Sequence, residues 1–284
     1  METEFRTPVL SAFADEASPE LSGQIAAMRR NGISGLEVRG VDGKSVSDLT
    51  LSEAREIRAR LEGEGLFAWS AGSPMGKIGI TDPFEPHLEK FRHTLEVTRE
   101  LGAERMRMFS FFLPKEDDPA AWKNAVLDRL AQFCEAADGS GVFLCHENEK
   151  GIYGDVASRC AEIHAALPGL RAVFDPANFI QCGQDTLEAW DLLGDLVDYM
   201  HIKDALPDGI VVPCGKGAGH VPEIIAAFRS RGGDHFTLEP HLTVFDGLGA
   251  LERDGIRSGI CEFAYPTADA AFDAACAALK TYLN

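Results

Sequence analysis

The sequence is poor in positive charge and contains no long hydrophobic run. Its 27 lysine and arginine residues stand against 45 acidic residues, which gives a formal net charge of −18. Such a charge repels phosphate backbones, and nucleic-acid binding would need a strong local basic patch to overcome it, so we expect no nucleic-acid partner. No apolar stretch approaches the ~20 residues needed to cross a bilayer. Because the first ten residues, METEFRTPVL, also show no basic segment followed by an apolar one, we expect neither membrane association nor an export signal.

Cysteine pairs are also missing. The seven cysteines are an odd number and form no C-x-x-C pair. This argues against a disulfide framework and against a structural zinc site built on thiolates, so we predict reduced thiols in a cytoplasmic protein. Glycine and proline are scattered without a period, which excludes collagen-like and low-complexity classes.

The sequence does contain a pattern of short apolar runs alternating with amphipathic stretches, repeated eight times. A hydrophobic period of 3.6 residues indicates helices, and short buried runs between them indicate strands. The predicted strands are Pro8–Phe13, Gly35–Arg39, Leu66–Ala71, Arg105–Ser110, Val142–Glu147, Ala172–Asp175, Tyr199–Lys203 and His235–Glu239. The predicted helices are Pro19–Asn31, Leu51–Glu62, Pro86–Leu101, Trp122–Ala137, Asp155–Leu167, Leu187–Leu196, Val221–Arg231 and Ala268–Leu283.

Eight strand-then-helix units with right-handed crossovers close naturally into a (β/α)8 TIM barrel, an α/β fold. The competing fold is a doubly wound open sheet. That fold would show a glycine-rich nucleotide turn after its first strand, where this chain has ADEASPE instead. We therefore predict one domain over residues 1–284, with an insertion at about 243–265 before the last helix.

Four consecutive predicted strands end in a side chain that can bind a metal. These are Glu147, Asp175, His201 and Glu239, separated by 26 to 38 residues. The carboxyl ends of barrel strands meet at one rim, where active sites lie. Three buried acids and a histidine would repel one another or remain unsatisfied there without a cation. We predict a divalent metal site, the alternative being a structural hydrogen-bond network.

Oxygen-rich ligation with a single imidazole favours Mn2+, our first choice, with Mg2+, Co2+ or Zn2+ as alternatives. Open positions on such an ion would suit a carbonyl and a neighbouring hydroxyl. This arrangement supports proton transfer next to a carbonyl through a metal-stabilised enediolate. Glu147 and Glu239 are the candidates to take the proton from one carbon and return it to another.

These residues also carry a resemblance to a known family. The order of Glu147-Asn148, Asp175, the run His201-Ile-Lys203-Asp204, and Glu239 resembles the xylose-isomerase-like TIM-barrel superfamily of sugar phosphate isomerases and epimerases. The GKGAG segment at 215–219 resembles the glycine-rich loop of that family, and the similarity runs from Leu10 to about Leu242. The resemblance implies that the four positions bind one divalent metal and that the two glutamates act as acid and base. The chain departs from many family epimerases at residue 178, an asparagine where they have histidine.

Five further residues are expected to contact substrate. Glu37 is an acid inside a strand, and Arg39 pairs with it or with an anionic substrate. Lys203 and Asp204 orient the neighbouring imidazole or a substrate hydroxyl, the alternative being a plain ion pair. His241 contacts substrate or is a hydrogen-bonded structural histidine. The backbone N–H groups of the GKGAG loop are candidates to bind a phosphate or carboxylate.

Two more side chains have two interpretations each. Trp69 stacks on a sugar face or belongs to the core. His146, beside Glu147, touches substrate or points away from the barrel axis by strand alternation.

The predicted function is that of a metal-dependent isomerase or epimerase acting on a sugar or sugar phosphate. One alternative is a metal-dependent dehydratase or lyase acting on a polyhydroxy ketone or keto acid. Another is an AP endonuclease-like DNA repair enzyme, which the superfamily includes but which needs extra histidines after the third and fourth strands. This chain reads WSAGS and RMFSF there. A barrel that only binds is the non-catalytic alternative. The expected partner is a small carbohydrate-like molecule, with self-association into a homo-oligomer also open.

Overall fold

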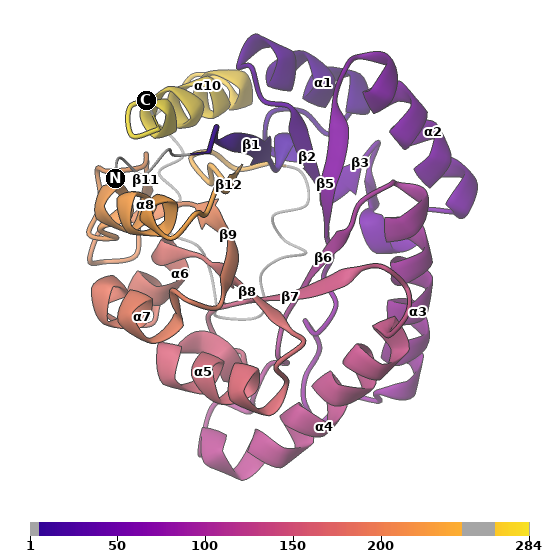
Figure 1. The fold of residues 1–284 in the computed structure, drawn as a ribbon, viewed down its shortest axis with the longest axis vertical. Helices are drawn as coiled ribbons and strands as arrows, with labels where there is room; N and C mark the ends of the chain where they lie inside the picture. Colours follow the sequence, from indigo (N-terminus) through magenta and orange to yellow (C-terminus); the bar gives the residue numbers. More distant parts are fainter. Residues whose placement is uncertain (1–5, 246–264, 284) are drawn as a thin grey trace.

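Eight parallel strands close into a barrel in the computed structural model, which describes residues 6–245 and 265–283. Around the barrel the order is β1-β12-β9-β8-β7-β6-β5-β2 (Figure 1). The strands are β1 (Val9–Ala12), β2 (Gly35–Val38), β5 (Phe67–Gly72), β6 (Arg105–Met108), β7 (Phe143–Glu147), β8 (Arg171–Phe174), β9 (Val197–Ile202) and β12 (His235–Leu238). The predicted (β/α)8 barrel is confirmed, and each predicted strand is present.

Helices surround the barrel in a ring, one or more after each strand (Figure 1). They are α1 (Leu21–Arg30), α2 (Leu51–Gly63), α3 (Glu85–Glu100), α4 (Pro119–Ala137), α5 (Ala157–Ala166), α6 (Pro176–Gln181), α7 (Thr186–Leu193), α8 (Val221–Ser230) and α10 (Ala268–Lys280). Local sequence sets their first residues. Thr50 and Glu53 form a capping box that begins α2, and the Asp118 side chain caps α4.

The last helix lies beside the first and closes the ring (Figure 1). Asp273 of α10 accepts hydrogen bonds from Arg30 Nε at 3.0 Å and Asn31 Nδ2 at 2.6 Å, at the end of α1. These contacts join residues more than 240 positions apart, so they fix the helix after β12 against the helix after β1.

An apolar cluster lies inside the barrel, below the charged side chains of the carboxyl end. Trp69, Cys145, Val173 and Tyr199 form this buried cluster. Trp69 stacks on His235, the first residue of β12, so it lies toward the amino ends of the strands and belongs to the core. The predicted metal ligands lie at the carboxyl ends, and charged side chains are buried beneath them.

The structure adds short elements that hydrophobic periodicity does not predict. They are the helix α6, the hairpins β3 (Gly40–Val41) with β4 (Lys44–Ser45) and β10 (Asp204–Ala205) with β11 (Val211–Val212), and the 3-10 helices η1 (Ala14–Glu16), η2 (Val46–Asp48) and η3 (Tyr153–Asp155). All of them follow the carboxyl ends of strands, where TIM barrels build their sites.

Two predictions depend on the rest of the chain. Most of the predicted insertion at about 243–265 falls on residues 246–264, outside the described residues, so the insertion and the single-domain interpretation stay predictions. Within residues 6–245 and 265–283, no helix combines the length and apolar character needed to cross a membrane.

Candidate metal centre

Four adjacent strands bring the predicted metal ligands together. Glu147 is the last residue of β7 and His201 lies near the end of β9, while Asp175 and Glu239 directly follow β8 and β12. All four residues are at most 3% exposed. Each offers one ligand atom, and these atoms lie within 4.8 Å of one another. The structure therefore places the four residues in one buried cluster.

Both glutamates approach the same nitrogen of His201. Its Nδ1 is 2.9 Å from Glu147 Oε1 and 3.4 Å from Glu239 Oε2. The Lys203 ammonium occupies the other side of the cluster, with Nζ 2.7 Å from Asp175 Oδ2 and 3.2 Å from Glu239 Oε2. Three carboxylates and an imidazole thus share a small volume with one buried amine.

The second oxygen of each carboxylate is held by another partner. Arg107 Nη1 donates to Glu147 Oε2 at 2.7 Å, and Arg39 Nη1 donates to Glu239 Oε1 at 3.3 Å. The other oxygen of Asp175, Oδ1, accepts the Asn178 backbone N–H at 3.0 Å, so Asp175 is the N-cap of α6. These bonds leave one oxygen of each carboxylate directed into the shared cluster.

Charge in the cluster shifts its pKa values in opposite directions. Burial alone would raise the pKa of Glu147, but the charges of His201 and Arg107 outweigh burial and lower this pKa to about 2. Burial would also raise the pKa of Glu239. The charges of Lys203 and His241 outweigh burial, so this pKa lies well below its ordinary value. The pKa of Asp175 rises to about 7, because burial and the two glutamates outweigh the nearby ammonium. Of the three carboxylates, Asp175 is therefore the one whose ionised form its surroundings favour least.

The residues fit a divalent cation. Asp175 Oδ2 is fully buried and accepts no hydrogen bond of good geometry, although Lys203 is close. Burial lowers the pKa of His201, but Glu147 and Glu37 raise it well above its ordinary value, which is the response of an imidazole surrounded by carboxylates. Carboxylate oxygens with one imidazole suit Mg2+, Mn2+ or Zn2+. This buried group of Glu, Asp and His could therefore hold a metal ion.

A second group lies next to the first and shares Glu239. Glu16, Glu239 and His241 also place ligand atoms within 4.8 Å of one another. Here, however, the Arg39 guanidinium is 3.1 Å from Glu16 Oε1 and 3.3 Å from Glu239 Oε1, and it also binds Asp15. Because arginine already supplies positive charge at these oxygens, we interpret this group as a buried salt-bridge network.

The structure places the five predicted substrate contacts differently from one another. Lys203 lies in the ligand cluster, as described. Arg39 and His241 lie in the salt-bridge network, where His241 Nδ1 is 3.0 Å from Glu16 Oε1. Glu37 is fully buried and contacts His201 Nε2 at 3.2 Å. None of these placements tests a contact with substrate, which stays a prediction.

Asp204 is engaged by the glycine-rich loop. Its two carboxylate oxygens accept the N–H groups of Gly215, Gly217 and Gly219 at 2.9 to 3.0 Å. A Cβ at residue 217 would lie 2.3 Å from the Ala205 carbonyl oxygen, so only glycine fits there. The prediction that these N–H groups bind a ligand phosphate or carboxylate is wrong, because the protein's own carboxylate takes them.

His146 points away from the barrel axis. The space beside it is so tight that a Cβ at Gly154 of η3 would lie 2.5 Å from its Cε1. Burial lowers the pKa of His146 to about 3, so the ring is neutral. Strand alternation therefore decided between the two interpretations of this residue.

The sequence interpretation missed several residues of the site. The sequence patterns do not single out Arg107, Tyr199 or Phe13, while Asn148 enters only as part of the family pattern and Asn178 only as a departure from it. Asn178 Nδ2 donates to the Asn148 carbonyl oxygen at 2.9 Å and lies 3.4 Å from Glu147 Oε1. A charged residue within an apolar strand, the signal that marked Glu37, would have found Arg107 as well.

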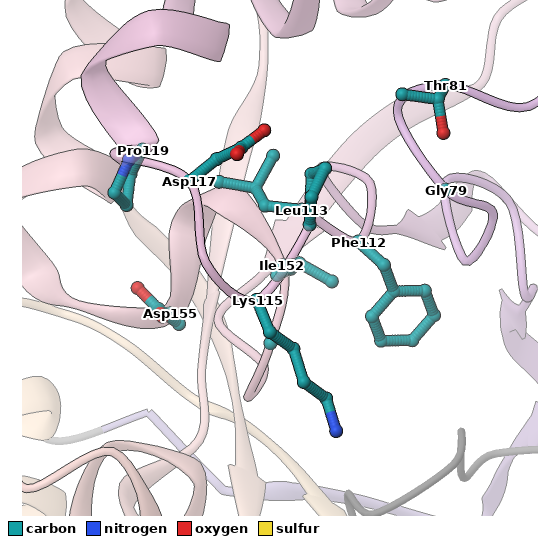
Figure 2. A pocket seen from close by; sticks show the side chains of 11 residues that line it. Gly79, Thr81, Phe112, Leu113, Lys115, Asp117, Pro119, Ile152 and Asp155 are labelled. Atoms are coloured by element: carbon teal, nitrogen blue, oxygen red, sulfur yellow. The ribbon is translucent and has the colours of Figure 1, made fainter.

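A cavity of about 470 Å³ opens on the same rim, to one side of the ligand cluster. Loops after β5, β6 and β7 form it, and Figure 2 shows Phe112 and Lys115 extending from one loop beside Ile152. Phe112 and Ile152 pack on Phe109, whose ring lies 4.6 Å from the Arg107 guanidinium. Phe109 and Arg107 thus connect two residues of the cavity lining to Glu147.

Comparison with solved structures returns the same fold at low sequence identity. The IOLI protein, solved with a bound zinc atom, has a TM-score of 0.73 at 15% identity and covers 98% of both chains. The probable 3-DHS dehydratase AsbF of Bacillus anthracis has a TM-score of 0.71 at 15% identity, covering 97% of this chain and 99% of its own. D-Psicose 3-epimerase of Clostridium cellulolyticum H10 has a TM-score of 0.72 at 14% identity, covering 96% and 98%.

No curated protein matches the sequence. The chain does match one family, described as the xylose isomerase-like TIM barrel, over residues 25–257. That match includes all four clustered ligands and the glycine-rich loop. The chain therefore belongs to the xylose isomerase-like TIM barrel family.

Proposed function

We propose that this protein is a divalent-metal-dependent isomerase or epimerase of a small polyhydroxy carbonyl compound, a sugar or sugar phosphate. The observation that carries the proposal is the buried cluster of Glu147, Asp175, His201 and Glu239 at the carboxyl ends of adjacent strands. Epimerases are among the proteins of similar fold, which is consistent with this assignment.

Glu147, Asp175, His201 and Glu239 would hold the metal, with Mn2+ our first choice. When bound, the ion would act as a Lewis acid that polarises a carbonyl and stabilises negative charge developing on its oxygen. Glu147 and Glu239 both border the cluster, within 3.4 Å of His201 Nδ1, so one could take a proton while the other returns one. Arg107 and Arg39 orient these carboxylates and keep them ionised.

A second candidate function is that of a dehydratase or lyase, favoured by Lys203. Burial lowers the pKa of this amine, but Asp175 and Glu239 raise it above its ordinary value, so the group is an ammonium. This ammonium lies 3.2 Å from the base Glu239, where it could hydrogen-bond to a departing hydroxyl and stabilise the negative charge that develops on it. A dehydratase of similar fold is consistent with this alternative.

DNA repair is disfavoured. An AP endonuclease-like centre needs further histidines after the third and fourth barrel strands, here β5 and β6. Within the described ranges, the histidines grouped with possible ligands are His201 and His241, and neither follows β5 or β6. The net charge of −18 also opposes binding to a phosphate backbone.

The experiment is metal analysis of protein purified without chelator, followed by incubation with a panel of ketoses, ketose phosphates and keto acids in D2O. We expect about one divalent ion per chain and solvent deuterium in the product. Retention of every hydroxyl assigns an isomerase or epimerase, and loss of a β-hydroxyl assigns a dehydratase. Protein that binds no metal, or a metal-loaded protein that exchanges no proton with any member of the panel, would contradict the proposal.

Three further predictions belong to this proposal, and the structure tests none of them. We expect a cytoplasmic protein, a small carbohydrate-like ligand as its partner, and self-association into a homo-oligomer as an open alternative to a monomer. Mn2+ as the preferred ion has the same standing, with Mg2+, Co2+ and Zn2+ as alternatives.

A further inference from the structure

The two ring nitrogens of His201 face different partners. Nδ1 faces the ligand cluster, 2.9 Å from Glu147 Oε1. Nε2 faces away from it and lies 3.2 Å from Glu37 Oε2. The Phe13 ring packs edge-on against the imidazole at 5.0 Å, which limits rotation of the ring. A carboxylate outside the ligand set therefore controls the second nitrogen.

Glu37 is itself held in place. Its other oxygen, Oε1, accepts the Tyr199 hydroxyl at 2.9 Å. The pairing of β2 with β5 shifts register between Leu36 and Glu37, a local irregularity of the kind that re-aims a side chain. The Glu37 side chain is fully buried, yet no residue of the ligand set other than His201 is bonded to it. Its contacts are those of a support for the imidazole.

We propose that Glu37 is a positioning residue that fixes the tautomer of His201 with hydrogen on Nε2. This inference rests on the proposed metal centre. Glu147 and Glu239, which face Nδ1, belong to the proposed ligand set, so Glu37 is the carboxylate outside that set that accepts a hydrogen bond from the ring. Nε2 is then the donor, and Nδ1 keeps its lone pair for the ion. Tyr199 holds Glu37 in the orientation that serves Nε2. On this inference Glu37 orients the metal ligand His201, whereas the sequence predicts a contact with substrate.

Nitrogen-15 NMR of the Zn2+-loaded protein with labelled histidine tests the tautomer directly. The His201 signals are assigned by their absence in His201→Asn. We expect a metal-shifted Nδ1 and a protonated Nε2 whose hydrogen exchanges slowly with water. The reverse pattern, with Nε2 on the metal or no hydrogen on it, would overturn the inference.

Zn2+ affinity, measured by competition with a chelating dye, tests the role of the carboxylate. Partners that orient a ligating histidine are typically worth ~10–100-fold in metal affinity. We expect Glu37→Gln, which no longer dictates the tautomer, to lose about 10-fold, and Glu37→Leu, which leaves Nε2–H unpaired, to lose about 100-fold. Tyr199→Phe should lose less, because Glu37 still reaches His201.

Thr237→Val is the matched control. Thr237 pairs in register with His201 on the neighbouring strand, is fully buried, and its hydroxyl has no hydrogen-bond partner. This variant should bind Zn2+ as the wild type does. Melting curves with chelator present show which variants are folded, and if Glu37→Leu is not, Glu37→Gln and the wild-type spectrum decide.

The two proposals fail in different ways. A wild-type protein that binds no Zn2+ contradicts the metal centre itself. A wild-type protein that binds Zn2+ while both folded Glu37 variants bind it equally well contradicts only the positioning role.

Discussion

Each of the two glutamates proposed to transfer protons is held by its own arginine. Arg107 on β6 binds Glu147, and Arg39, directly after β2, binds Glu239. The Phe13 ring lies between these arginines, 4.4 Å from one guanidinium and 5.2 Å from the other. Buried ion pairs of this kind orient carboxylates more than they stabilise a fold, because desolvation offsets most of their attraction.

Glu239→Gln should abolish turnover and weaken metal binding, because the same carboxylate is both ligand and proton-transfer group. Arg39 keeps Asp15 and Glu16, and Lys203 keeps Asp175, so neither cation is stranded. We therefore expect the metal-free protein to lose only ~1–3 kcal/mol of unfolding free energy, the cost of one impaired buried hydrogen bond.

Metal content and urea unfolding with chelator check this expectation. Glu56→Gln removes the same charge from an exposed position on α2 and should change neither. Unchanged metal content in Glu239→Gln would show that Glu239 is not a ligand.

Among the elements, the loop after β9 is organised by one carboxylate. Asp204→Ala would leave the N–H groups of three glycines and of Ala205 without their acceptor. The unfolding free energy should fall by more than the ~1–3 kcal/mol of one orphaned group, while Zn2+ affinity stays within a few-fold. Urea unfolding and Zn2+ titration measure both quantities. Asp208→Ala, in the exposed turn of the same hairpin, should cost less than about 0.5 kcal/mol. A large loss of Zn2+ affinity in Asp204→Ala would instead place Asp204 in the metal site.

The loop after β5 is attached to α3 through His87, and this contact gives stability a pH dependence. His87 Nε2 accepts the Gly76 N–H at 2.8 Å, and burial lowers the pKa of His87 to about 4. The unfolded chain, with a histidine pKa near ~6.5, then binds a proton that the folded chain does not. The stability contributed by neutral His87 is present above pH ~6.5 and is lost as the pH falls toward about 4.

His87→Gln should therefore flatten the dependence of unfolding free energy on pH between about 6.5 and 4 by up to one proton. Urea unfolding at several pH values, with chelator present, measures the slope. His220→Gln, at an exposed position, is the control and should leave the slope unchanged. A His87→Gln slope equal to that of the wild type would mean that His87 has the same pKa in the folded protein as in the unfolded chain.

At the scale of the whole molecule, the net charge gives a test of the nuclease alternative. With a net charge of −18, the protein should not bind duplex DNA at ~150 mM salt and should not nick an abasic duplex. A gel-shift assay and a nicking assay with metal-loaded protein check this, with a known AP endonuclease as positive control. Nicking that disappears in His201→Ala would reverse the functional assignment.

The sequence by itself determined the order of elements and the residues at the strand ends. Hydrophobic period and helix caps are local features, so the sequence predicts the eight strands and their main helices. It also predicts Glu147 and His201 at the ends of two strands. The sequence does not predict short elements such as α6, because six residues are too few to show a helical period.

Only the tertiary structure decided which side chains meet. Glu37 and His201 are 164 residues apart, and Arg39 and Glu239 are 200 apart, so closure of the barrel alone brings them into contact. Asp204 could have faced substrate as readily as a loop until the folded GKGAG segment presented its N–H groups. Periodicity tells which face of an element is buried. It does not tell which of several buried polar groups will satisfy another, because that depends on distances set by the whole barrel.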